Sequence, residues 1–234
     1  MISQLIKDDL VSFSSPDKAL ILQRFFKTGK GEYAEGDIFA GCTVPEVRAV
    51  AKKFCKQINL SDIEQLLKDS IHECRLCGLI LLTHLFNKSG EADKKEIVDF
   101  YLQHTDAVNN WDLVDISSYN ILGNWLIDKK DRSILYKLAD SENLWEQRIA
   151  MVSTMALVKN RDFGDAMSLA EHFLTHKHDL MHKAAGWLLR EVGKKNDEIL
   201  LSFLDIHYKK MPRTMLRYAI EKLPQNEKAY YMKK

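Results

Sequence analysis

Among the side chains that could bind or stabilise charge are the indoles of Trp111 and Trp187, the carboxylate of Asp115 and the guanidinium of Arg148. Indole faces attract cations, a carboxylate stabilises a positive charge beside it, and a guanidinium binds phosphate. Trp111 and Asp115 are four residues apart. On a helix their side chains are therefore neighbours, whatever the rest of the fold.

Regularly spaced helices would position these side chains. The apolar residues of five stretches recur at helical spacing: 72–86, 111–127, 145–159, 182–192 and 213–223. Their early polar positions, Arg75, Asp112, Arg148, Lys183 and Arg217, are spaced by 37, 36, 35 and 34 residues, with another amphipathic helix between each pair. A helical hairpin of about 36 residues is close to the HEAT-type repeat. We predict an all-α fold, an α-solenoid of HEAT-like hairpins in a single domain over 1–234. The alternative is a non-repetitive helical bundle.

Several helix starts can be predicted from local signals. Ser15 precedes Pro16, Thr43 precedes Pro45, and Asn110 precedes Trp111. Ser61 with Glu64 three residues later reads as a capping box.

Equivalent helices of stacked hairpins would line one concave surface. We number each of the four residues from the early polar position of its own repeat. Trp111 is then at −1, Asp115 at +3, Arg148 at 0 and Trp187 at +4. These positions fall within an arc of roughly 140° on a helix. The four side chains could therefore share one groove.

Each of these residues also has a purely structural interpretation. Both tryptophans could be core aromatics. Asp112 and Asp115 could be first-turn carboxylates that face the positive end of a helix. Arg148 could bridge neighbouring hairpins. Spacing alone does not choose between these roles and a binding site.

Composition favours helices and an ordinary globular chain. The 234 residues are 46% hydrophobic and 29% charged, with 10 Gly and 4 Pro, too few for a turn-rich β fold or a disordered chain. No stretch reaches 18 consecutive apolar residues, and the first ten residues do not resemble a secretory signal. We therefore expect a cytoplasmic protein without a membrane partner.

The charge is unevenly distributed. The whole chain has a formal net charge of +1, but residues 148–234 carry +6 and residues 1–147 carry −5. A basic C-terminal part suggests an anionic partner, and the alternative is a solvated basic face.

Two groups of residues could bind a metal by spacing alone. Cys74 and Cys77 lie inside an apolar helix without a second pair, and with Cys42 and Cys55 they are expected to be reduced thiols. The histidines His172, His176, His178 and His182 form two pairs four residues apart, at a helix end and connection. We predict neither a metal nor a cofactor, and a metal-dependent hydrolase using the histidines is the least supported alternative.

Four strings resemble the AlkD family of DNA alkylation repair glycosylases. They are FFKTGKGEYAEGDIFAGCTVPEVRAVAKKF (25–54), NNWDLVD (109–115), HKAAGWLLREVGK (182–194) and MPRTMLRYAIEKLP (211–224). The resemblance covers nearly the whole chain, in order. It implies a HEAT-like solenoid that holds duplex DNA on a basic concave face and excises N3- and N7-alkylated purines without base flipping, as a monomer.

The resemblance also implies roles for particular residues. The WDxVD string gives Trp111 and Asp115, the GW[LM]LREVGK string gives Trp187, and Arg148 matches the family's active-site arginine. Asp115 would stabilise the oxocarbenium-like transition state, Trp111 and Trp187 would cradle the deoxyribose, and Arg148 would hold a phosphate. The further DNA contacts would be Lys27, Lys30, Tyr33, Lys183, Arg190, Arg213 and Arg217. The near-neutral charge motivates one alternative, a non-enzymatic HEAT-like module that binds DNA or protein on the same face.

Overall fold

The computed structural model describes residues 1–233, which fall into two compact units. Unit 1 comprises residues 1–117, and unit 2 begins at Ser118. Within 1–233 the secondary structure is helical, apart from an isolated parallel bridge between Ile38 and Ile71. The predicted all-α, solenoid-like fold class is confirmed, whereas the single repeat domain stays a prediction.

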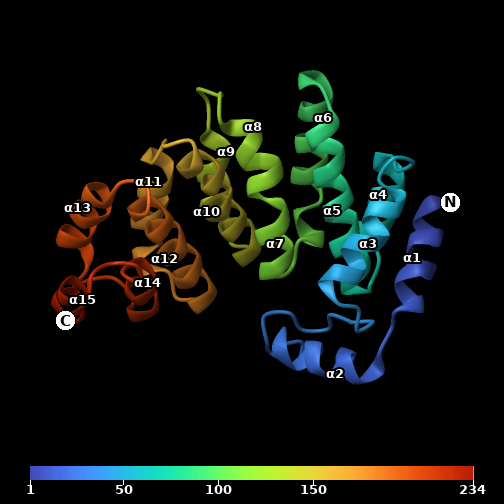
Figure 1. The fold of residues 1–234 in the computed structure, drawn as a ribbon, viewed down its shortest axis with the longest axis horizontal. Helices are drawn as coiled ribbons and strands as arrows, with labels where there is room; N and C mark the ends of the chain where they lie inside the picture. Colours follow the sequence, from blue (N-terminus) through green and yellow to red (C-terminus); the bar gives the residue numbers. More distant parts are fainter. Residues whose placement is uncertain (234) are drawn as a thin grey trace. The chain divides into compact units, whose positions relative to one another are not determined.

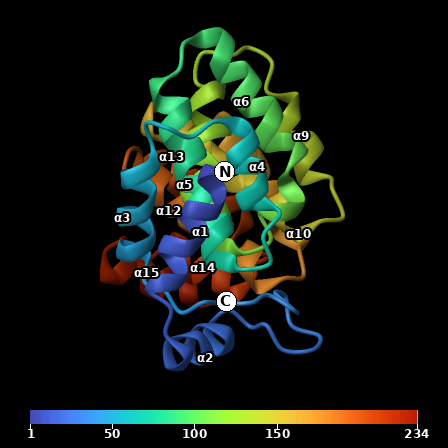
Figure 2. The same cartoon turned by 90° about the vertical axis from the view of Figure 1, so that its right-hand side faces the viewer.

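Unit 1 is built around one central helix. Its elements are α1 (Ile2–Ser12), α2 (Pro16–Phe25), α3 (Val44–Phe54), α4 (Leu60–Leu67), α5 (His72–Lys88), α6 (Glu91–Gln103), a 3-10 turn (Thr105–Ala107) and α7 (Trp111–Ser117). Most of α5 is buried, and α1, α3, α4, α6 and α7 all contact it. A helix that is covered on all sides carries little amphipathic pattern, as α5 shows. In both views α2 lies at one end of the unit and α6 at the other (Figures 1 and 2).

Local capping explains where several of these helices begin. Ser15 accepts a hydrogen bond from the backbone N–H of Lys18, and the backbone N–H of Thr43 donates to Glu46. The predicted start at Ser61 is wrong: α4 begins at Leu60, because the side chain of Asn59 accepts from the N–H of Asp62 at 2.9 Å. Asparagine is as strong an N-cap as serine, and it comes first in the chain.

Unit 2 continues with helical hairpins. Its elements are a π-helical turn (Tyr119–Gly123), α8 (Asn124–Leu126), α9 (Ser133–Ala139), α10 (Leu144–Lys159), α11 (Gly164–His172), a 3-10 turn (Phe173–Thr175), α12 (Asp179–Gly193), α13 (Asp197–His207), α14 (Arg213–Ala219) and α15 (Gln225–Met232). The mostly buried α10 packs against α9, α11 and α12, and α12 packs against α14 (Figure 1).

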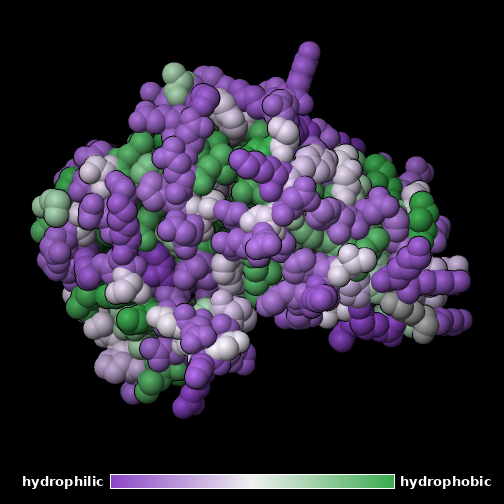
Figure 3. All heavy atoms as spheres, turned by 180° about the vertical axis from the view of Figure 1, so that it is seen from behind, coloured by the Kyte–Doolittle hydropathy of each residue, from purple (hydrophilic) through white to green (hydrophobic). Residues whose placement is uncertain are grey.

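One face of the molecule is mainly polar. Seen from behind, hydrophilic residues cover most of the face and hydrophobic ones form small separate patches (Figure 3). Among the described residues, no helix combines the length and the apolar character needed to cross a membrane.

Candidate active site

Trp111 and Asp115 lie one turn apart on α7 and are both partly exposed. The helix begins where the Asn110 side chain accepts a hydrogen bond from the backbone N–H of Trp111 at 2.8 Å. Leu113, Val114 and Ser117 of the same helix are buried, and α7 packs against α5. The predicted neighbour relationship follows from this helical spacing.

A column of aromatic rings lies behind the Trp111 indole. Trp111 stacks on Phe26, with ring centroids 5.2 Å apart, and Phe26 stacks on Phe39 at 5.0 Å. Phe39 in turn stacks on the imidazole of His72 at 4.4 Å. Phe25 contacts Trp111 edge-on at 5.9 Å and is itself exposed. The indole is therefore held by rings from α2, the following loop and α5.

The same imidazole takes part in a buried network of charged groups. His72 Nδ1 lies 2.8 Å from Asp37 Oδ2, and His72 Nε2 lies 2.8 Å from Asp112 Oδ2. Arg75 pairs with the other oxygen of Asp37, and it also donates to the side chain of Asn109 at 3.2 Å. The network joins the loop after α2, the first turn of α5 and the first turn of α7.

The electrostatics of the network favour charged groups. Burial of His72 opposes its charge, but hydrogen bonds to Asp112 and Asp37 and the attraction of both carboxylates outweigh it and raise the pKa of His72 to about 9. Burial likewise opposes ionisation of Asp37, but His72 and Arg75 outweigh it and hold the pKa of Asp37 below its usual value. The buried Oδ1 of Asp112 has no hydrogen-bond partner.

Asp115 is electrostatically coupled to the interior of unit 1. The fully buried Tyr101 has its pKa raised by burial, and the Asp115 charge adds to that effect. The Tyr101 hydroxyl is 3.0 Å from Ser117 Oγ, which donates to the Leu113 carbonyl at 2.6 Å. A carboxylate close to low-dielectric protein acts more strongly on a neighbouring charge than one in open water.

Arg148 and Trp187 belong to unit 2. Arg148 is only 5% exposed, and its Nη1 donates to the backbone carbonyl of Leu180 at 2.6 Å. Trp187 is partly exposed on α12. The preceding residue, Gly186, lies directly against the α14 backbone at Met215. The structure thus pairs Trp111 with Asp115 in unit 1, and the groove shared by all four residues stays a prediction.

Most of the further DNA contacts predicted from the sequence are exposed or partly exposed, and several have internal partners. Lys183 pairs with Asp179 at 2.9 Å, Arg190 with Glu221 and Glu191, and Lys27 with Glu32 at 3.8 Å. The remaining ones are Lys30, Arg213 and Arg217, which are exposed, and Tyr33, which is half-buried. A cation that already has a carboxylate partner contributes less to phosphate binding than a free one.

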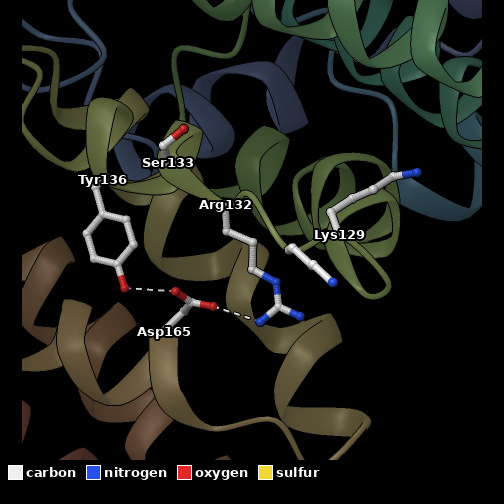
Figure 4. A pocket seen from close by; sticks show the side chains of 6 residues that line it. Lys129, Arg132, Ser133, Tyr136 and Asp165 are labelled. Atoms are coloured by element: carbon white, nitrogen blue, oxygen red, sulfur yellow. Dashed lines mark hydrogen bonds and ion pairs between the residues drawn. The ribbon is translucent and has the colours of Figure 1, made fainter.

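A separate pocket in unit 2 lies near the start of α9 and contains no predicted site residue. It is lined by Lys129, Lys130, Arg132, Ser133, Tyr136 and Asp165. The Asp165 carboxylate lies between the Tyr136 hydroxyl, at 2.7 Å, and the Arg132 guanidinium, at 2.9 Å (Figure 4). Arg132 also donates to the carbonyls of Leu126 and Ile127, so it ties this hairpin together.

Three of the four cysteines are buried, and the four histidines considered as metal ligands have partners within the protein. Burial raises the pKa of the Cys42 thiol to about 11 and those of Cys74 and Cys77 to about 12. His178 Nδ1 caps α12 by accepting from the N–H of Leu180. His176 is 2.8 Å from Gln147 through Nε2. Among residues 1–233, no group of three or more His, Cys, Asp or Glu side chains could hold a metal ion.

Sequence reasoning missed the residues that hold α7. Asp37, His72, Phe26 and Phe39 received no role, and Arg75 served only as a repeat marker. One signal was available: His72 and Arg75 are polar residues directly before a stretch, 76–82, that has no polar side chain. Buried polar residues need partners, but the sequence does not name those partners.

Fold and site together define an all-α helical-repeat protein with an aromatic and acidic site on one helix. A family model described as DNA alkylation repair enzyme matches residues 6–223, so the chain belongs to this family. It is also similar to a solved structure titled "Predicted DNA alkylation repair enzyme from Enterococcus faecalis", with a TM-score of 0.70 and 18% identity over 91% of this chain and 97% of that one. No curated protein matches.

Proposed function

We propose that this protein is an AlkD-like DNA glycosylase that excises cationic N3- and N7-alkylated purines from duplex DNA. The observation that carries the proposal is the partly exposed Trp111–Asp115 pair on the braced helix α7, in a chain of the DNA alkylation repair enzyme family. Both residues stand in the WDLVD string, in which the resemblance places catalytic residues.

The chemistry needs one carboxylate and no general acid. A purine alkylated at N3 or N7 is already positively charged, so it leaves with the electron pair of the glycosidic bond as a neutral base. Positive charge then develops on the deoxyribose, and Asp115 stabilises it. Water adds to C1′ and gives its proton to solvent. Ordinary glycoside hydrolysis uses a second carboxyl group to protonate the leaving group, and here that group is unnecessary.

The other residues position the substrate. The Trp111 indole offers an apolar, electron-rich face to a deoxyribose that becomes cationic. Trp187 offers a second indole, and Arg148 and the basic residues of unit 2 contact phosphates. The lesion stays stacked in the duplex, without base flipping. The protein acts as a monomer, in the cytoplasm, without metal or cofactor.

The test is release of free base from duplex DNA that carries a defined N7-methylguanine, at low salt. Wild-type protein is compared with Asp115→Asn and with the matched control Asp106→Asn, an exposed aspartate in the same unit. We expect release by wild type and the control, and none by Asp115→Asn, although that variant still binds DNA. Release by Asp115→Asn at the wild-type rate would show that the assigned role is wrong.

The second candidate is a non-enzymatic module that binds DNA or protein. It is favoured by the internal carboxylate partners of Lys183 and Arg190, which reduce the free positive charge of unit 2. If wild-type protein binds duplex DNA but releases no base, this function replaces the first.

A further inference from the structure

His72 is connected to helix α7 directly by a hydrogen bond and indirectly by a column of aromatic rings. Its Nε2 is bonded to Asp112, the residue that follows Trp111. Its ring is also the far end of the column that continues through Phe39 and Phe26 to the Trp111 indole. With a side chain only 1% exposed, His72 lies beneath the site and is out of reach of a substrate.

The hydrogen-bond geometry fixes the charge state of this ring. Both ring nitrogens lie 2.8 Å from carboxylate oxygens, Nδ1 from Asp37 and Nε2 from Asp112. Carboxylates only accept hydrogen bonds, so both nitrogens must donate, and only the imidazolium has two N–H groups. A neutral ring would place a lone pair against one of the two carboxylates.

We propose that the His72 imidazolium is the positioning residue of the candidate active site, and that it fixes the first turn of α7 and thereby the helix that carries Trp111 and Asp115. The consequence for base excision rests on the proposed function. The mechanical role does not, because it concerns only the order of α7.

The charges around the ring are nearly balanced while it is protonated. Asp37 faces it from the loop after α2 and Asp112 from α7, and Arg75 on α5 pairs with Asp37. Asp37 would keep Arg75 as a partner if the proton were lost. Asp112 depends more on His72, which supplies the hydrogen bond to its Oδ2, while its Oδ1 has none. Deprotonation leaves one N–H for two carboxylates and removes the positive charge beside Asp112, so the link between His72 and α7 weakens.

The experiment compares His72→Gln with His84→Gln, the same substitution at an exposed position of the same helix. Amide hydrogen exchange reports the order of α7, and single-turnover base release and duplex binding report function. For His72→Gln we expect faster exchange at the α7 amides, base release slower by about 10- to 100-fold and little change in DNA affinity. We expect His84→Gln to match wild type in all three.

A titration of the unsubstituted protein keeps the proposal testable if His72→Gln does not fold. Nitrogen NMR of the histidine side chains distinguishes an imidazolium from a neutral ring. We expect His72 to be doubly protonated at pH 7, and protection of the α7 amides to fall as it titrates in the alkaline range. A neutral His72 at pH 7, or α7 protection that does not follow its titration, would overturn the proposal.

Failure of the two proposals would look different. If wild-type protein releases no base but exchange in α7 still depends on His72, the glycosylase function is wrong and the positioning role stands. If wild type releases base and folded His72→Gln releases it equally fast with unchanged exchange, the positioning role is wrong and the glycosylase function stands.

Discussion

Arg148 on α10 donates a hydrogen bond of 2.6 Å to the carbonyl of Leu180, in the first turn of α12. The bond joins two neighbouring hairpins, and the guanidinium is almost completely buried. The sequence left two roles open for Arg148, a bridge between neighbouring hairpins and a contact with phosphate. The hydrogen bond to Leu180 gives it the first role. Both roles are compatible with one side chain, and they predict different losses on substitution.

Arg148→Lys should lower the free energy of unfolding by about 1–3 kcal/mol, because lysine cannot reproduce the direction of the buried guanidinium bond. Urea unfolding measures this loss. The control is Arg217→Lys at an exposed position, where little change is expected. If Arg148→Lys unfolds like wild type but binds duplex DNA much more weakly, phosphate contact is its main role.

The stability of the protein should fall as the pH rises from neutral to alkaline values. His72 has a pKa of about 9 in the folded state, above the value of about 6.5 of an unfolded chain. The protonated ring therefore contributes about 3 kcal/mol to the free energy of unfolding. This contribution is fully present below about pH 6.5 and is lost as the pH rises through about 9.

Urea unfolding at several pH values between 6 and 10 measures this slope, and His72→Gln should lack it. Asp37 affects the stability of the protein at acidic pH. Because its pKa is lowered by folding, its contribution is present above about pH 4 and is lost on acidification. A wild-type slope that persists in His72→Gln would assign the alkaline loss to other groups.

The helices could be predicted from the sequence because their signals are local. The five apolar stretches, the starts at Ser15 and Asn110 and the Trp111–Asp115 pair depend on residues within a few positions of one another. Even the error at Ser61 is local, since a second capping residue, Asn59, lies two positions earlier. Hydrophobic spacing and capping act over one or two helical turns, which a single sequence displays.

The bracing of the site could not be predicted, because it joins distant residues. His72 is 35 residues from Asp37 and 40 from Asp112. Each is an ordinary polar residue until tertiary packing buries it beside the others. The π-helical turn at Tyr119–Gly123 is a similar case. A Cβ at Gly123 would lie 2.3 Å from the Ser153 carbonyl oxygen on α10, so this close approach depends on a partner 30 residues away.

Gly186→Ala should destabilise unit 2. A Cβ at this position would lie 2.5 Å from the carbonyl oxygen of Met215 and 2.6 Å from Cβ of Tyr218, so α12 and α14 would have to separate. The expected loss is about 1–3 kcal/mol, although alanine favours a helix by about 1 kcal/mol relative to glycine. Gly90→Ala is the control, since a Cβ there meets nothing within 4 Å. Thermal unfolding compares the two, and equal midpoints would show that the helices can separate at no cost.

Glu221→Gln should strengthen binding to undamaged duplex DNA. Glu221 pairs with Arg190, one of the predicted phosphate contacts, and with Lys222 at 2.9 Å. Removing the carboxylate charge leaves Arg190 with one carboxylate partner, Glu191 at 3.4 Å, and removes a repulsion of the DNA. We therefore expect affinity to rise about threefold and the dependence of log K on log salt to steepen by about one unit. The control Glu198→Gln makes the same charge change at an exposed position of α13. Binding is measured by fluorescence anisotropy at several salt concentrations. Equal gains in both variants would mean that net charge alone acts, and no gain from Glu221→Gln would remove Arg190 from the DNA-binding surface.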